Sequence, residues 1–373
     1  MSMPDFPDLP TPIAALKPYV PGLPLETLAR RLAVAPEHIA KLASNENPLG
    51  PSPRALRAMA EAAIDVSRYP DTDCAGLTAD LARWHDVPED WVVVAAGSES
   101  LLGHVVTATL GPGRKAVYPR YAFQAFVNAV QKVGASGVVV DEPDLVVDID
   151  AMIQALAEQP HLVYVANPGN PTGTWLEPDA LARWLAAVPP HVVVVLDEAY
   201  VEFLPPDARG DAMAWVRRYP NLVVTRTFSK AYGLAGLRVG YAITQTPLAD
   251  VLRRVRSPFT VTTVAQVAAQ AALEDTEFLA RTLHNNAESG ARLRTGLAQL
   301  GYRVLPSATN FVLAQVGDGA AWARAMEQQA LIVRPVGNYG LPAWVRISIG
   351  TPAETERLLA AATRLATAAS VTQ

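Results

Sequence analysis

The sequence predicts an α/β protein with a mainly parallel seven-stranded sheet, followed by a smaller α+β region. Between residues 90 and 245, short runs rich in β-branched residues alternate with amphipathic stretches of helical length, which is typical of such a sheet. The run VVVVLD (192–197) is apolar on both faces, as expected for a parallel strand covered by helices on each side. After Pro258 the pattern changes to a long Ala-rich helical region, then to short strands and a helix. The strand candidates are 91–96, 115–118, 137–140, 162–167, 192–197, 222–227 and 238–243.

These changes of pattern predict the domain organisation. Residues 1–50 are Pro-rich and irregular, and we expect them to form an N-terminal arm that packs with the small domain and the active site. A helix pattern at 53–66 has Pro near its first turn. We expect a large domain at 51–258 and a small C-terminal α+β domain at 259–373, the latter with helical sequence at about 264–300.

Composition excludes several classes of protein. The chain has 373 residues, of which 50% are hydrophobic, so it can bury a sizeable core. Its net charge of −5, without a basic run interleaved with aromatics, gives no attraction to nucleic acid or to an anionic membrane. The uncharged apolar runs have only strand length, the N-terminus lacks a signal-peptide pattern, and the single cysteine, Cys74, cannot form an internal disulfide. We therefore expect a cytoplasmic metabolic protein that binds neither nucleic acid nor membrane.

Polar clusters follow four of the predicted strands. In open α/β sheets, ligands bind outside the carboxyl ends of the strands, so the residues that come directly after each strand are informative. The clusters are GSES after 91–96, NPGNPTG after 162–166, DEAY after 192–196 and FSKAYG after 222–227. Turn chemistry alone does not explain polar and Gly/Pro-rich residues at every one of these ends.

Lys230 is the candidate nucleophile among them. It lies in the largely apolar segment TFSKAYGLAGLRVG, where burial would lower the pKa of its amine and make it nucleophilic. Such an amine can form a Schiff base with an aldehyde cofactor. From this segment alone, a surface lysine on a tight turn is an equal alternative.

Asp197 and Tyr200 follow the apolar run 192–196. A carboxylate that emerges there needs a cationic partner, and a protonated pyridine nitrogen is one that turns the ring into an electron sink. Tyr200 could present its hydroxyl to the same ring. The alternative for Asp197 is a cap on the following turn.

A phosphate and a ring oxygen complete the predicted ligand. Ser98 and Glu99 follow Gly97 at a strand-to-helix junction, where free N–H groups favour an anion. Ser229 and, eight residues beyond Lys230, Arg238 could add a hydroxyl and a fixed cation for the phosphate. Asn170 offers an amide to a ring oxygen, and the alternative for its loop is a simple turn. Together these residues describe a pyridoxal phosphate site.

The same residues carry a family resemblance. The sequence resembles the fold-type I pyridoxal-phosphate aminotransferases, and specifically the histidinol-phosphate aminotransferase family. The matching stretches are KLASNENPLGPSP (41–53), SRYPD (67–71), ANPGNPTGTW (166–175), VVLDEAY (194–200), TRTFSKAYGLAGLRVGY (225–241), ATNFV (308–312) and IVRPVGNYGLPAWVRISIG (332–350). They span nearly the whole chain in order, so the resemblance covers both predicted domains.

The resemblance implies a role for each residue at the cofactor. Lys230 would bind pyridoxal phosphate covalently and act as the general acid and base of the proton shift. Asp197 would pair with the pyridine nitrogen, Tyr200 and Asn170 would contact the ring oxygen, and Phe123 would stack on the ring. The implied phosphate ligands are Ser98 and Glu99, through their main chain, and Ser229 and Arg238.

The resemblance also implies a homodimer and a substrate pocket. Tyr69 would reach the phosphate of the neighbouring subunit's cofactor. Arg346 would bind an anionic group of the substrate, and Arg334 and Tyr19 its distal phosphate or side chain. Asn47 belongs to the N-terminal arm that closes over the site. The implied reaction is a ping-pong transamination from L-histidinol phosphate, or a related donor, to 2-oxoglutarate.

Several residues depart from the family pattern and point to an altered substrate wall. They are Glu99 in the phosphate loop, His104 behind it, Thr260 and Thr262 in SPFTVTT, and Phe126 in place of a common Tyr. A lost hydrogen-bond donor in such a wall can change specificity greatly. His104 is equally explained as an ordinary buried histidine.

Other functions remain as alternatives. Within the superfamily these are an aromatic or other amino-acid aminotransferase, or a threonine-phosphate decarboxylase-like enzyme. A nicotinamide-dependent oxidoreductase is disfavoured because no G-x-G-x-x-G follows a predicted strand. A non-catalytic regulator is disfavoured because the first fifty residues contain no helix-turn-helix pattern or basic patch. The six histidines lack the spacing of metal ligands, and no G-x-S-x-G nucleophile elbow occurs.

Overall fold

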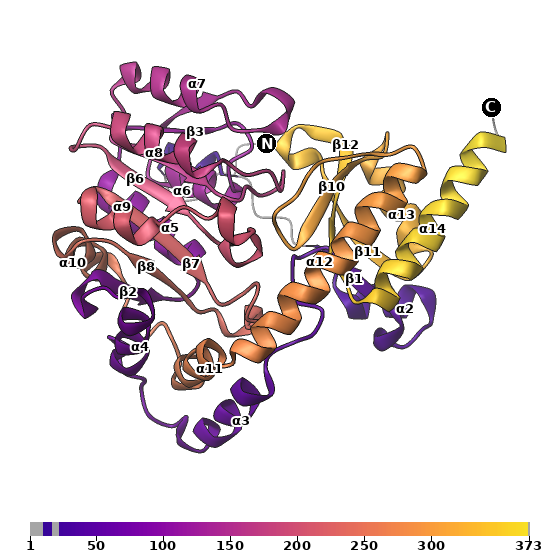
Figure 1. The fold of residues 1–373 in the computed structure, drawn as a ribbon, viewed down its shortest axis with the longest axis horizontal. Helices are drawn as coiled ribbons and strands as arrows, with labels where there is room; N and C mark the ends of the chain where they lie inside the picture. The colour runs from indigo at the N-terminus through magenta and orange to yellow at the C-terminus, as the bar shows by residue number, and fades with distance from the viewer. Residues whose placement is uncertain (1–9, 17–21, 372–373) are drawn as a thin grey trace, which may run out of the picture.

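The structure is a computed structural model that describes residues 10–16 and 22–371, and its elements gather around two β-sheets (Figure 1). One sheet has seven strands and is built from the middle of the chain, and the other has five strands and is built mostly from the C-terminal third. Within the described residues, no helix combines the length and apolar character needed to cross a bilayer.

The seven-stranded sheet has the order β2-β8-β7-β6-β5-β3-β4. Its strands are β2 (Val92–Ala95), β3 (Lys115–Pro119), β4 (Ser136–Val140), β5 (Leu162–Ala166), β6 (Val193–Asp197), β7 (Leu222–Thr227) and β8 (Gly240–Ile243). Neighbours from β7 to β4 pair in parallel, whereas β8 is antiparallel to both β2 and β7. The prediction of a mainly parallel seven-stranded sheet is confirmed, with strand bounds within two residues of those expected.

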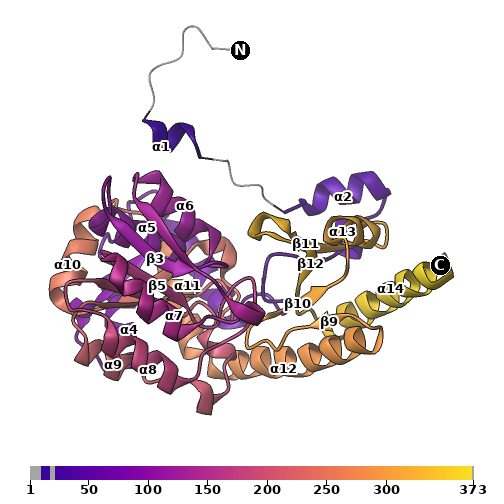
Figure 2. The ribbon, with the colours of Figure 1, turned by 90° about the horizontal axis from the view of Figure 1, so that it is seen from above.

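Helices cover both faces of this sheet, which explains why its strands are apolar throughout. Alternate residues of one strand enter different cores: Val163 and Val165 pack on one side of β5, and Leu162 and Tyr164 on the other. Figure 2 shows α5 and α6 on one side and α4, α8 and α9 on the other. The covering helices are α4 (Ala75–His85), α5 (Ser98–Thr109), α6 (Gln124–Lys132), α7 (Ile149–Gln154), α8 (Pro178–Ala187), α9 (Ala212–Arg218) and α10 (Thr246–Val255).

The five-stranded sheet has the order β1-β11-β12-β10-β9. Its strands are β1 (Ala40–Leu42), β9 (Arg303–Val304), β10 (Phe311–Gln315), β11 (Leu331–Val336) and β12 (Leu341–Ser348), and only β1 and β11 pair in parallel. Its core packs against α12 (Thr276–Gln299), α13 (Gly319–Glu327) and α14 (Pro352–Val371). The N-terminal segment is therefore less irregular than expected: β1 joins this sheet, and α2 (Leu25–Leu32) packs beside Ile332 of β11.

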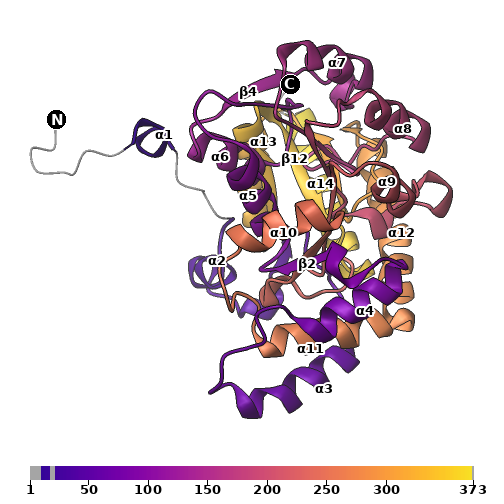
Figure 3. The same cartoon turned by 90° about the vertical axis from the view of Figure 1, so that its left-hand side faces the viewer.

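The long helical region predicted at 264–300 is two helices. The first, α11 (Thr263–Glu274), packs against α3 (Pro53–Ala62) and α4, as Figure 3 shows. The second, α12, begins after Asp275, whose Oδ1 accepts the amide N–H of Phe278 at 3.2 Å. An Asp at the N-cap satisfies a donor that the helix itself leaves unpaired, so the break lies there. The short helix α1 (Thr11–Ala14) lies beside α6.

Gly240 is where β8 passes the start of α5, and only a residue without a side chain fits. A Cβ at this position would lie 2.4 Å from the amide nitrogen of Ser98 and 2.9 Å from the carbonyl oxygen of Arg226. Both neighbours are backbone atoms, so the strand or the helix start must move to make room.

We expect Gly240→Ala to lower the free energy of unfolding by about 1–3 kcal/mol, the usual effect of overpacking. Gly111→Ala is the matched control, since a Cβ there has no atom within 4 Å. Urea unfolding of both variants beside the wild type measures the difference. Equal stability of the Gly240→Ala variant and the wild type would show that this approach tolerates a methyl group.

Candidate active site

A cavity of about 950 Å³ lies at the carboxyl ends of the parallel strands. Its wall contains residues that follow β2, β5, β6 and β7, together with side chains from β11 and β12 of the second sheet. Eleven of the residues assigned from the sequence line this cavity: Ser98, Glu99, Phe123, Asn170, Asp197, Tyr200, Ser229, Lys230, Arg238, Arg334 and Arg346. Among the described residues, no group of three or more His, Cys, Asp or Glu is placed to hold a metal ion.

Asp197 is the last residue of β6, and its carboxylate is buried at the floor of the cavity. Oδ1 accepts the hydroxyl of Thr225 at 3.0 Å, and Oδ2 accepts the hydroxyl of Tyr164 at 3.1 Å. Burial raises the pKa of Asp197 to about 6, although these two hydrogen bonds act in the opposite direction. A buried carboxylate held by two neutral donors still favours a cation on its open side.

Tyr200 is the centre of a hydrogen-bond network that spans both sheets. Its hydroxyl oxygen accepts the side-chain amide of Asn45 at 2.9 Å and that of Asn170 at 3.4 Å. The Oδ1 of Asn170 in turn accepts Nη1 of Arg346 at 2.6 Å, and Nη2 of Arg346 donates to the carbonyl of Ala43 at 3.0 Å. Burial raises the pKa of Tyr200 to about 12, so its hydroxyl stays protonated as a donor.

Lys230 projects its amine toward the same network. Nζ donates to the carbonyl oxygen of Ser44 at 3.4 Å and lies 5.8 Å from the centre of the Tyr200 ring. Burial is the main reason why the pKa of Lys230 falls to about 8, and the positive charges of Arg346 and Arg238 add to it. With this pKa, roughly a tenth of the amine is neutral at pH 7, a far larger share than for an ordinary lysine.

The residues expected at a phosphate surround the start of α5. Gly97 occupies the N-cap at φ 85°, and no side chain caps the first N–H groups of this twelve-residue helix. Nη1 of Arg238 lies 3.4 Å from the hydroxyl of Ser229, and its guanidinium lies 3.9 Å from the Glu99 carboxylate. The side chains of Arg238 and Glu99 are about half exposed, so an anion can displace the carboxylate. We call residues 97–99, Ser229 and Arg238 the phosphate cradle.

The two phenylalanines of YAFQAF have different places. Phe123 lines the cavity at the N-cap of α6, where it can cover one face of a ring. Phe126 is fully buried and stacks on Tyr164, with ring centroids 4.1 Å apart. The interpretation of Phe126 as part of the substrate wall is therefore wrong, because the third residue of this helix faces the sheet.

Three other departures from the family pattern also lie outside the lining of the cavity, whereas Glu99 is part of it. Thr262 is the N-cap of α11 and accepts the N–H of Ala265 at 3.2 Å, and Thr260 is exposed. Nδ1 of His104 is buried without a hydrogen-bond partner among the described residues, and burial lowers its pKa. The ordinary reading of His104 as a partly buried residue of α5 agrees with this placement.

Two arginines of the second sheet face the cavity. Arg334 of β11 and Arg346 of β12 are direct partners in the antiparallel register, and both line the cavity. Two guanidinium groups at one wall suit a strongly anionic substrate group.

Two described residues that were assigned from the sequence do not line this cavity. Tyr69 is 84% exposed, and its ring lies 4.8 Å from that of Phe259. Asn47 donates to the carbonyl of Ala231 at 3.0 Å and to the hydroxyl of Thr282 at 3.1 Å, so its amide joins three segments beside the site. Tyr19 lies outside the described residues.

Sequence reasoning missed three side chains that shape the site. Asn45 lies in the same NENPLG-containing motif as Asn47, but it is Asn45 that reaches Tyr200. Thr225 and Tyr164 lie inside β7 and β5 and donate to Asp197. A hydroxyl in an otherwise apolar buried strand is the signal that could have identified the latter two, because such a group needs a partner.

Comparisons with known proteins agree with this geometry. A family model described as aminotransferase class I and II matches residues 37–361. The chain is 52% identical over 354 residues to histidinol-phosphate aminotransferase 2 of Ralstonia nicotianae, an alignment that covers 94% of each protein. It is 47% identical over 356 residues to histidinol-phosphate aminotransferase 1 of Cupriavidus pinatubonensis, covering 94% of this chain and 95% of that one.

Comparison with solved structures supports the same family. The crystal structure of histidinol-phosphate aminotransferase from Sinorhizobium meliloti in complex with pyridoxal-5'-phosphate superposes with a TM-score of 0.88 at 32% identity, covering 98% of this chain and 100% of that one. Since the matches span both sheets, the fold-type I architecture belongs to the whole chain. The chain is an enzyme of the aminotransferase class I and II family and belongs, within it, to the histidinol-phosphate aminotransferases.

Proposed function

We propose that this aminotransferase binds pyridoxal phosphate covalently through Lys230 and transfers an amino group from L-histidinol phosphate to 2-oxoglutarate by a ping-pong mechanism. The observation that carries the proposal is the shared cavity of Lys230 and Asp197, a nucleophilic amine and a buried carboxylate at neighbouring strand ends. The amine of Lys230 suits the cofactor's aldehyde, and the carboxylate of Asp197 suits its pyridine nitrogen.

The residues around the cavity fit the remaining groups of the cofactor. The phosphate cradle supplies helix N–H groups, a hydroxyl and a guanidinium for the phosphate. Tyr200 and Asn170 would donate to the ring oxygen, and Phe123 would cover the ring. When bound, pyridoxal phosphate supplies a carbonyl that takes up the amino group and a ring that withdraws electrons from the substrate carbon.

The chain's own residues would then hold and move protons. With its pKa near 8, the free amine of Lys230 would act as the general base that takes the proton from the substrate's α-carbon and then as the general acid that returns it. Asp197, held by Thr225 and Tyr164, would keep a proton on the pyridine nitrogen.

The two arginines support an anionic substrate. Arg346 is fixed by Asn170 and by the carbonyl of Ala43, so it can orient one anionic group beside Lys230. Arg334 lies next to it in the sheet and would add a second charge for the phosphate of L-histidinol phosphate. Tyr19 stays a predicted contact to the same group.

An exposed apolar surface supports a homodimer. Tyr69, Ile64 and Val66 are 84%, 89% and 67% exposed, and they lie together in one stretch of chain. Large apolar side chains that are this exposed are typical of a subunit interface. In the proposed dimer, Tyr69 reaches the phosphate of the partner's cofactor, and Asn47 steadies the segment that carries Asn45.

The first test is the identity of the amine. We expect the purified chain, loaded with pyridoxal phosphate and reduced with borohydride, to carry the label on Lys230 alone. Lys230→Ala should retain the fold and lose turnover by at least about a thousandfold, because it removes both the attachment point and the proton carrier. Peptide mass spectrometry locates the label. A label on another lysine, or near-normal turnover of the variant, would refute the assignment.

The lowered pKa of Lys230 makes a second prediction, for the cofactor-free protein. The folded-state pKa of about 8 lies below the ordinary value of 10.5, so the charged amine destabilises the fold below pH 8. Lys230→Met should therefore be more stable than the wild type at pH 7, by on the order of 3 kcal/mol. The difference should shrink as the pH rises from 8 to 10.5, where the wild-type amine is neutral in both states.

Urea unfolding of both proteins at a series of pH values measures this difference. Because every other group is shared, its pH dependence belongs to residue 230. A constant difference across the range, or a less stable methionine variant at pH 7, would contradict the lowered pKa.

A donor panel tests the substrate. With 2-oxoglutarate as acceptor, we expect kcat/KM for L-histidinol phosphate to exceed that for Phe, Tyr, Trp and Leu by orders of magnitude. Arg334→Ala should lower it by roughly ten- to a hundredfold for the phosphorylated donor and much less for the others. Asn338→Ala, an uncharged change in the same wall, is the control. Equal losses for all donors would exclude a phosphate contact for Arg334.

A further inference from the structure

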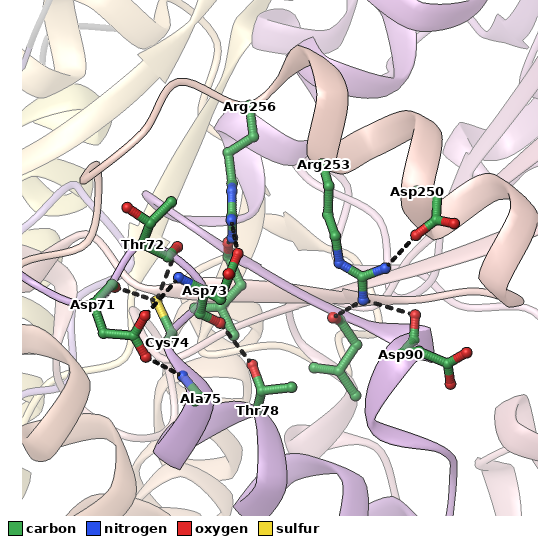
Figure 4. Close-up of polar contacts among 12 residues, drawn as sticks. Asp71, Thr72, Asp73, Cys74, Ala75, Thr78, Asp90, Asp250, Arg253 and Arg256 are labelled. Carbon is green, nitrogen blue, oxygen red and sulfur yellow. Dashed lines mark hydrogen bonds and ion pairs between the residues drawn. The ribbon is translucent and has the colours of Figure 1, made fainter.

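Arg256 is a buried arginine behind the phosphate cradle that the proposed chemistry does not use. It follows the last residue of α10, and its side chain is only 6% exposed. Nη1 donates to the carbonyl oxygen of Val94 at 3.1 Å, and Nη2 donates to Oδ1 of Asp73 at 2.8 Å (Figure 4). The two branches of one guanidinium therefore join Asp73 and Val94, which are 21 residues apart in the sequence.

The first of these segments is β2, the edge strand that leads into the cradle. β2 ends the order of the sheet and, in the described part of the chain, pairs with β8 alone. The Val94 carbonyl accepts its hydrogen bond from Arg256 rather than from a further strand. Three residues later, Gly97 caps α5 and begins the phosphate cradle. The hydrogen bond from Arg256 to the Val94 carbonyl thus fixes the end of β2, the strand that leads directly into the phosphate cradle.

The second segment is residues 66–74, which we call the Tyr69 loop. The carboxylate of Asp71 organises this loop by accepting the N–H of Asp73 at 3.0 Å and that of Ala75 at 2.7 Å. The carbonyl of Asp71 accepts Nε2 of Gln266, from α11, at 2.9 Å. At its start, Tyr69 packs on Phe259, which lies three residues after Arg256 and is held at φ 58°.

Arg253 supplies a natural comparison on the same helix. It lies one turn before Arg256, and Figure 4 shows the two side chains next to one another. Its Nη2 donates to the carbonyls of Asp90 at 2.7 Å and Val92 at 3.1 Å, and its Nη1 to Asp250 at 2.8 Å. Arg253 therefore holds the same strand edge with the same chemistry, but its hydrogen bonds do not include the Tyr69 loop.

We infer that Arg256 is a positioning residue that locks the Tyr69 loop to the phosphate cradle, so that subunit association and retention of the cofactor phosphate depend on one guanidinium. The inference rests on the proposed function, in which the cradle holds the phosphate of one subunit and Tyr69 reaches that of its partner. In each subunit, Arg256 would then align the phosphate cradle, which serves that subunit's own site, with Tyr69, which serves the partner's site. Only an arginine offers two branches at the angle that this bridge requires.

The test compares Arg256→Met with Arg253→Met. For each, we would measure the dissociation constants of pyridoxal phosphate and of pyridoxal, which lacks the phosphate, and the dimer dissociation constant by analytical ultracentrifugation. We expect Arg256→Met to lower the preference for pyridoxal phosphate over pyridoxal by about tenfold or more, the usual effect of losing a charge-assisted contact, and to weaken the dimer. Arg253→Met should lower the melting temperature and leave the preference within about twofold of wild type.

Asp73→Ala keeps the test valid if Arg256→Met fails to fold. The Asp73 side chain is 77% exposed, so its truncation spares the core and removes only the loop end of the bridge. We expect a weaker dimer and a smaller loss of phosphate preference. Wild-type values for Arg256→Met and Asp73→Ala, or equal losses in Arg253→Met, would overturn the inference. A wild-type chain that binds pyridoxal as tightly as pyridoxal phosphate would instead refute the proposed function.

Discussion

The burial of one carboxylate at the end of a parallel strand is the constraint on which the rest of the site depends. Asp197 is 4% exposed, and its hydrogen-bond donors in the described residues are neutral: the hydroxyls of Thr225 and Tyr164 and the backbone N–H of Ala199. A negative charge in such a place is costly unless a cation meets it, and its raised pKa records that cost. The sheet therefore places a poorly compensated negative charge at the cavity, and in the proposed function a protonated ring nitrogen would be its cationic partner.

The second sheet contributes side chains to the same cavity and joins them to residues that follow the parallel strands. Arg346 of β12, Asn170 after β5 and Tyr200 after β6 form one hydrogen-bond chain, and Asn45 completes it from the segment after β1. Asn45 is itself fixed by Ser348, whose hydroxyl accepts its backbone N–H at 2.8 Å. The amine of Lys230 lies against this chain, and its low pKa follows from the same enclosure and from the arginine charges. Tyr200, Lys230 and Arg346 thus share one set of contacts. A change in the packing of the two sheets would alter the surroundings of all three side chains.

The sequence predicts the parts of this arrangement that depend on periodicity and strand ends. The apolar runs identify the seven strands, and the polar residues after them meet at one edge because parallel strands end there. It could not separate Asn45 from Asn47, since this irregular segment, in which Asn45 has φ 54°, has no repeat that indicates which amide turns inward. Phe126 shows the same limit: helix α6 begins two residues before it, and that start decides which ring faces the cavity. The sequence around Arg256 indicates only a basic residue at the end of a helix. Its partners, in the edge strand β2 and in the Tyr69 loop, are distant from it in the sequence.

The central claim is that Asp197 holds a positive charge on the cofactor ring. The most direct measurement is the ¹⁵N NMR shift of pyridoxal phosphate labelled at its ring nitrogen, bound to the wild-type enzyme and, at the same pH, to the Asp197→Asn variant. The account requires the shift of a protonated pyridinium, and the shift of a neutral nitrogen in the Asp197→Asn variant. A neutral shift in the wild-type enzyme would contradict it, because the buried carboxylate would then have no cation to hold.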